Sequence, residues 1–160
     1  MRSSEPSVPN RQVSKVNKDV ILHLHSTIMQ PDETPTDRET QNMQLKKPAS
    51  YYEKEQVQLI FYTEEDPDSG AKTRCRLEVH DRKLVIMRTG VTTNQMELVI
   101  GKTTSTKYHT PFGLLEFDIT TDTLQIKQSE NELKILACYT LSSEGSVVSK
   151  HTLHIKLLNA

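Results

Sequence analysis

The feature that most constrains this chain is a period-two alternation of apolar and polar residues that recurs from residue 19 to the end. A period of two sends successive side chains to opposite faces of a β-sheet. The alternation is cleanest where Cys75, Leu77 and Val79 share one face and charged residues occupy the other. Helical spacing of apolar residues finds little support. The sequence therefore predicts an all-β protein with half-buried strands.

Further runs with this alternation predict more strands. Their apolar sets, which we expect to face the core, are Val20, Leu22 and Leu24; Val57, Leu59 and Phe61; Leu115, Phe117 and Ile119; Leu133, Ile135, Ala137, Tyr139 and Leu141; and Leu153, Ile155 and Leu157. Short turn segments separate the runs, and short connections favour antiparallel neighbours. We expect an antiparallel meander of about eight to ten strands that closes, fully or nearly, into a single β-barrel.

Composition divides the 160-residue chain into a tail and one domain. Residues 1–18 are rich in Ser, Pro, Asn and basic residues, with valines as their only aliphatic side chains, so a flexible tail or leader is expected. Residues 19–160 are assigned to a single β-barrel domain. Inside it, residues 30–40 hold two prolines and four carboxylates and are predicted to form a loop between strands.

Charge and hydropathy exclude several classes of protein. Twenty basic and twenty-one acidic residues leave a formal net charge of −1, so neither nucleic acid nor an acidic membrane face is expected as a partner. No run approaches the ~18 apolar residues of a membrane-spanning helix, and no secretory signal is recognised. Two cysteines, Cys75 and Cys138, without a paired motif favour a reducing cytoplasm; their pairing stays open.

Four stretches carry a family resemblance. They are Tyr51-Tyr52 with VQLIFY at 57–62, LVIMRTG at 84–90, MELVIG at 96–101 and YHTPFG at 108–113. Their order and spacing resemble the bacterial YwiB-like family, a domain of unknown function, over residues 19–158. The most specific pieces are the Arg88-Thr89-Gly90 corner and the YHTPFG turn. The resemblance implies a calycin-like, lipocalin-type β-barrel that can enclose a cavity; it implies no activity, and a fold alone does not settle function.

The histidines are weak metal candidates. His23 and His25 lie two apart on a predicted strand, so both rings can face one ion from the same side. A third ligand would have to be His151 or His154, which fall on opposite strand faces. A structural or solvated role is the more frequent one for such residues, and no metal or cofactor is predicted.

Catalytic signatures are also weak. The carboxylates at 64–68 precede Gly70 without the remaining positions of a calcium loop, and a solvated hairpin tip is the expectation. Neither a nucleophile elbow nor a glycine-rich phosphate cradle is present, and Glu116 and Asp118 are predicted to lie outside the barrel. We therefore assign no catalytic residue.

Three polar residues are in phase with core positions. Arg88 is in phase with Ile86, Tyr139 with Ile135, and Tyr108 with the threonines at 104 and 106. Facing inward, one guanidinium and two phenols would converge in an apolar lumen, which is the usual composition of a small-molecule site. A cation there favours an anionic ligand. The competing interpretations are a lumen filled by its own side chains and an Arg88 that reaches water beside its turn.

Three functions follow, in order of preference. The first is a small, cytoplasmic, non-enzymatic bacterial barrel that binds a small amphipathic ligand, with an anion favoured, at Arg88, Tyr108 and Tyr139. The second is a protein-interaction or structural module that uses the barrel exterior, with Ile60 and Tyr62 as its exposed residues. The third is an enzyme whose site is assembled from distant strands. The oligomeric state stays open.

Overall fold

The structure is a computed structural model that describes residues 16–30 and 41–159, with side chains from residue 18 onward. Its described residues form ten β-strands and no helix, which confirms the expected all-β fold. The strands are β1 (Val16–Met29), β2 (Gln41–Lys54), β3 (Val57–Glu65), β4 (Lys72–Val79), β5 (Lys83–Thr89), β6 (Asn94–Val99), β7 (Thr103–Thr110), β8 (Gly113–Gln128), β9 (Glu132–Ser143) and β10 (Ser146–Asn159).

The first strand starts earlier than expected. β1 begins at Val16, because its first residues pair with the end of β2, Val16 opposite Glu53 and Asp19 opposite Ser50. Residues 16–18, which we assigned to the tail, thus belong to the sheet. The rest of the expected tail, residues 1–15, and most of the expected loop, residues 31–40, lie outside the described residues.

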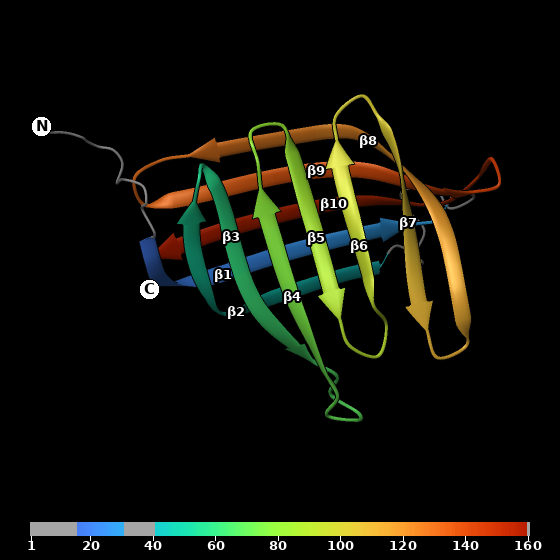
Figure 1. Cartoon of the computed structure of the whole chain (residues 1–160), viewed down its shortest axis with the longest axis horizontal. Helices are drawn as coiled ribbons and strands as arrows, with labels where there is room; N and C mark the ends of the chain where they lie inside the picture. Colours follow the sequence, from blue (N-terminus) through green and yellow to red (C-terminus); the bar gives the residue numbers. More distant parts are fainter. Residues whose placement is uncertain (1–15, 31–40, 160) are drawn as a thin grey trace, which may run out of the picture.

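All ten strands belong to one antiparallel sheet in the order β6-β5-β4-β3-β2-β1-β10-β9-β8-β7. The long strands β1, β2, β8, β9 and β10 lie side by side, and β3 to β6 run across them (Figure 1). The apolar core fills the space between these two layers. Its most buried large side chains come from both: Leu22, Ile60, Leu77, Leu84, Leu98, Ile119 and Ile155.

Between β6 and β7 the barrel is nearly closed, by one isolated backbone bridge and by side-chain hydrogen bonds instead of a continuous ladder. Thr93 and His109 exchange two backbone hydrogen bonds of 3.0 and 2.8 Å, which form an isolated bridge just before β6. Further along, the hydroxyls of Thr104 and Thr106 donate to carbonyl oxygens of β6 at 2.7 and 2.8 Å. These bonds satisfy acceptors of β6 that would otherwise belong to an open sheet edge.

The expected orientation of β3 is wrong. Val57, Leu59 and Phe61 were expected to face the core, with Ile60 and Tyr62 outside. Ile60 is instead fully buried, Tyr62 is 6% exposed and Phe61 is 36% exposed. The outward Phe61 packs edge-on against another exposed ring, Tyr52, with centroids 5.6 Å apart.

The partner strand determines which face of β3 is buried. Residues 57–62 are apolar at five of six positions, so β3 alone does not specify a face. In the observed register Ile60 lies opposite Leu77 and Tyr62 opposite Cys75, both on the clearly buried face of β4. A shift of one residue would move the apolar set of β4 out of the core, and its cost selects this register.

The start of β8 also departs from expectation. Of the set expected in the core, Ile119 is buried and Phe117 packs against the core, whereas Leu115 is 51% exposed. Leu115 lies at the β7–β8 hairpin, where Phe112 and Leu114 are 99% and 54% exposed. The phase of the alternation is therefore correct, but the hairpin end carries an exposed apolar tip, defined here as Phe112, Leu114 and Leu115.

The corner after β5 requires glycine at position 90. A Cβ there would lie 2.6 Å from the Thr73 hydroxyl, 3.0 Å from the Thr73 Cα and 3.1 Å from the Lys72 carbonyl oxygen. We expect Gly90→Ala to lower the free energy of unfolding by about 1–3 kcal/mol, because β4 and β5 must separate locally. Urea denaturation measures this. Adding Thr73→Ala to Gly90→Ala removes the crowding hydroxyl but not the two backbone atoms. The second substitution should therefore restore less than half of the lost stability, and full restoration would contradict the backbone clash.

Candidate functional site

The lumen holds a cavity of about 480 Å³. It lies at the end of the barrel where β1 ends and β2 begins, and where β5 ends and β6 begins. Arg88, Tyr108 and Tyr139, the three residues selected from the sequence, all line it. They come from β5, β7 and β9, which are far apart in the chain. The structure therefore brings the three predicted residues to the same cavity, whose other lining residues include Leu24, Leu77, Ile86 and Met96.

A row of paired residues gives this cavity its polar side. Tyr62, Cys75, Arg88 and Asn94 lie opposite one another on β3, β4, β5 and β6, so their side chains share the inner face. The strand alternation places polar atoms here because these positions continue the buried phases of Ile60, Leu77, Ile86 and Met96. Polar groups thus enter the lumen without interrupting the sheet.

Arg88 is paired with a carboxylate inside the lumen. Its Nη1 donates to Glu64 Oε1 at 2.8 Å, and the two side chains are 34% and 23% exposed. Burial lowers the pKa of Arg88, but the acidic groups of Tyr62 and Glu64 beside it outweigh that effect, and the net shift is upward. The arginine therefore stays charged, and the pair contributes almost no net charge to the cavity.

Two residues that line this cavity each carry a buried oxygen without a hydrogen-bond partner in the described part of the chain. The atoms are Glu64 Oε2 and Asn94 Oδ1, and the equally buried Tyr62 hydroxyl has the Cys75 thiol as its neighbour. Buried polar atoms in folded proteins are almost always hydrogen-bonded, because leaving one unpaired costs roughly 1–3 kcal/mol. Both residues line the same cavity, so a small side-chain shift would let water or a ligand there supply the missing donors.

Aromatic rings form the opposite wall. Tyr139 stacks on the His151 ring with centroids 4.7 Å apart, and the Tyr108 hydroxyl donates to the Met96 sulfur at 3.4 Å. Burial raises the pKa of both tyrosines, which keeps their hydroxyls protonated. Burial also lowers the pKa of His151 to about 4, so its imidazole is neutral at physiological pH and exchanges a 2.8 Å hydrogen bond with Ser149.

The acidic cluster at 64–68 is divided by the structure. Glu64 points into the lumen, whereas Asp66 stays in the exposed hairpin and accepts hydrogen bonds from the Ser69 hydroxyl at 2.8 Å and the Asp68 amide at 3.2 Å. The Ser69 bond holds the pKa of Asp66 below its usual value. The hairpin interpretation fits Asp66 and Asp68, and it missed the inward role of Glu64.

The histidine candidates do not assemble a metal site. His23, His25 and His154 lie on the outer face of the sheet, and His151 lies inside. His25 and His154 stack with centroids 6.1 Å apart. Among the described residues, no group of three or more His, Cys, Asp or Glu side chains is placed to hold a metal ion.

The two cysteines occupy different faces. Cys75 is buried in the inner row beside Arg88, and Cys138 lies half-buried on the outer face opposite Thr152. Both are free thiols in the described part of the chain. The pairing that the sequence left open is therefore not made in this fold.

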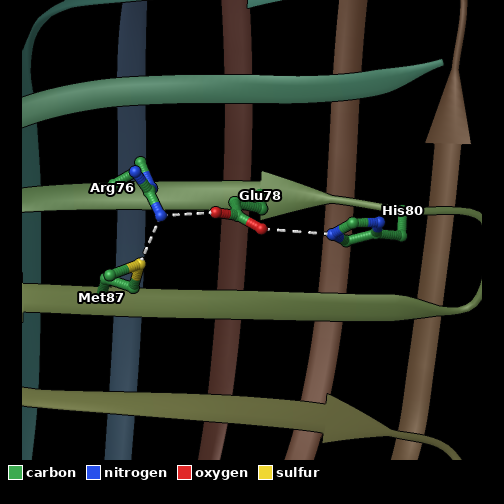
Figure 2. Close-up of polar contacts among 4 residues, drawn as sticks. All are labelled: Arg76, Glu78, His80 and Met87. Atoms are coloured by element: carbon green, nitrogen blue, oxygen red, sulfur yellow. Dashed lines mark hydrogen bonds and ion pairs between the residues drawn. The ribbon is translucent and has the colours of Figure 1, made fainter. Parts of the chain in front are cut away.

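The polar face of β4 forms a network of its own. Arg76 contacts Glu78 and Met87, and Glu78 also contacts His80 (Figure 2). The Arg76 guanidinium lies 2.7 Å from Glu78 Oε2 and 2.7 Å from the Met87 sulfur, and His80 Nε2 lies 3.3 Å from Glu78 Oε1. These charges balance one another on the outside of β4 and β5. The charged residues that alternate along β4 are therefore explained by this outer, solvent-facing network.

Comparison with known proteins agrees with the fold. The profile of the family described as "Domain of unknown function (DUF1934)" matches residues 24–155. The crystal structure of the YwiB protein from Bacillus subtilis is similar at a TM-score of 0.75 and 23% sequence identity, over 94% of this chain and 98% of that one. No curated protein matches the chain. Within the described residues there is no helix with the length and apolar character needed to span a membrane. The chain belongs to the DUF1934 family of domains of unknown function.

Proposed function

We propose that this chain is a cytoplasmic, non-enzymatic binding protein that holds a small amphipathic ligand in its lumen. The observation that carries this proposal is a cavity whose lining residues include Arg88 and two residues with unpartnered buried oxygens, Glu64 and Asn94. Its volume, about 480 Å³, lies within the ~300–1,000 Å³ of small-molecule sites. A lumen filled by its own side chains would not leave this volume.

The polar groups define the ligand chemistry. Arg88 keeps N–H donors beyond the one bonded to Glu64, and these suit a carboxylate, sulfonate or similar acceptor. Glu64 Oε2 and Asn94 Oδ1 require donors. Because Glu64 balances the charge of Arg88, a ligand that carries both an acceptor and a donor fits better than a simple anion. Its apolar part would lie against Tyr108 and Tyr139.

A titration with the amphipathic anion 1-anilinonaphthalene-8-sulfonate tests this proposal. Ser26 lines the cavity, and Ser26→Phe would fill it with a ring. We expect this variant to weaken dye binding at least about tenfold, because the apolar contacts and the space are lost. Thr27→Phe is the matched control, since it adds the same ring to the same strand on the outer face, and it should leave binding unchanged.

The double variant Glu64→Gln/Arg88→Gln tests the charge assignment. Removing both members avoids leaving one buried charge unpaired. The dye should bind about tenfold more weakly, because a charge-assisted hydrogen bond to its sulfonate is lost. Unchanged affinity in both this variant and Ser26→Phe would overturn the lumen site.

The exposed apolar tip of the β7–β8 hairpin favours a second candidate function, a protein-interaction module. Phe112, at 99% exposed, is the residue that a partner would cover. The residues predicted from the sequence for this contact, Ile60 and Tyr62, are buried and cannot serve. A dye signal that is lost in Phe112→Ser and retained in Ser26→Phe would favour this module over the lumen site.

A further inference from the structure

A line of basic side chains crosses the outer face of the five long strands. One residue of each strand lies directly opposite the next, and together they form the cationic row: Lys46 on β2, His23 on β1, Lys156 on β10, Lys134 on β9 and Lys127 on β8. Neighbouring strands are about 4.8 Å apart, so the row spans roughly 19 Å. The strands that carry it lie side by side in Figure 1.

The row crosses an open hollow with a volume of about 800 Å³. Four lysines and three histidines line this surface, and none of its described lining residues is Asp or Glu. The adjacent positions toward one side are Gln44, His25, His154, Leu136 and Gln125, all without a carboxylate. The face is therefore basic although the chain as a whole has a net charge of −1.

Within residues 16–30 and 41–159, one carboxylate approaches the row. Glu132 lies 3.8 Å from the Lys134 ammonium and 3.7 Å from that of Lys156. Four lysines and one glutamate leave a charge of +3 before any histidine is protonated. Like charges directly opposite one another on a sheet are destabilising, and a merely solvated face mixes both signs. An anion that bridges the strands would relieve this repulsion.

We infer that the cationic row binds single-stranded nucleic acid through its phosphates. Lysine recognises phosphate as a point charge, and a row of point charges can follow a phosphate backbone in any register. The described lining contains no arginine, the residue whose planar fork pairs with individual carboxylates of an acidic peptide. The stacked rings of His25 and His154 lie beside the row and offer an aromatic surface to a base.

Fluorescence anisotropy with a labelled oligo(dT) of about 20 nucleotides tests this inference on the full chain. At low salt we expect a dissociation constant of roughly 1–100 μM, and a slope of log affinity against log salt of about −2 to −3, from ~0.7 per phosphate contacted. Lys127→Gln/Lys134→Gln should weaken binding at least about tenfold and reduce the slope by about 1.4. Lys54→Gln/Lys72→Gln is the matched control and should change neither.

Glu132→Gln gives a readout with the opposite sign. Removing this carboxylate frees Lys134 and Lys156, so binding should strengthen about threefold or more. Equal effects of the two lysine pairs would overturn the inference. So would competition by polyglutamate or inorganic polyphosphate at concentrations below those at which unlabelled oligo(dT) or oligo(rU) competes, because the surface would then prefer another polyanion. Neither outcome bears on the lumen, which opens on the other face of the sheet.

Discussion

Ile60→Ala will lower the free energy of unfolding by about 2–5 kcal/mol. Ile60 is fully buried and lies opposite Leu77 at the centre of the core. Truncation removes its buried methyl groups and leaves a cavity that the surrounding sheet fills only in part. Urea denaturation with a constant m-value measures the loss, because a constant slope shows that the unfolded ensemble is unchanged.

The neighbouring Phe61→Ala is the matched control. Phe61 is 36% exposed and its main contact is the Tyr52 ring on the outer face, so its truncation should cost about 1 kcal/mol. A larger loss for Phe61→Ala than for Ile60→Ala would mean that β3 presents its other face to the core.

How much of the fold was predictable depends on each strand's own pattern. β4, β9 and β10 alternate clearly, and their buried faces follow the sequence, as with Leu77, Ile135 and Ile155. β3 is apolar on both faces, so only its pairing with β4 determines which side is buried. A pattern within one strand cannot report the energy of a contact with another.

The same ambiguity hid part of the lumen site. Ile60, Tyr62 and Glu64 alternate in one phase, so assigning Ile60 to the core would have placed Glu64 beside Arg88. With the opposite phase, Glu64 belonged to the exposed hairpin. His151, by contrast, is in phase with Leu153, and the alternation of β10 already contained the signal for its inward position.

The cationic row could not be predicted at all from the sequence. Its members are single basic residues on five strands, and the row exists because β1, near one end of the chain, pairs with β10, near the other. Net charge averages over such an arrangement. The net charge of −1 therefore argued against a nucleic-acid partner, because it does not reveal that four lysines lie together on one surface.

The second large effect expected is a loss of stability in mild acid that depends on His151. Burial in the lumen lowers its pKa from 6.5 to about 4 in the folded protein. The unfolded chain therefore takes up this proton first as the pH falls. The stability that neutral His151 contributes is complete above pH ~6.5 and is lost progressively down to about pH 4, by up to about 3 kcal/mol.

Urea denaturation of the wild type and His151→Gln at several pH values between about 7 and 4 isolates this residue, since glutamine does not titrate. The stability difference between the two proteins should move in favour of the variant by up to about 3 kcal/mol over that range. His154→Gln, on the outer face of the same strand, is the control for removing an imidazole from β10. A difference for His151→Gln that does not change with pH would mean that the ring reaches water freely, and would contradict its burial against Tyr139.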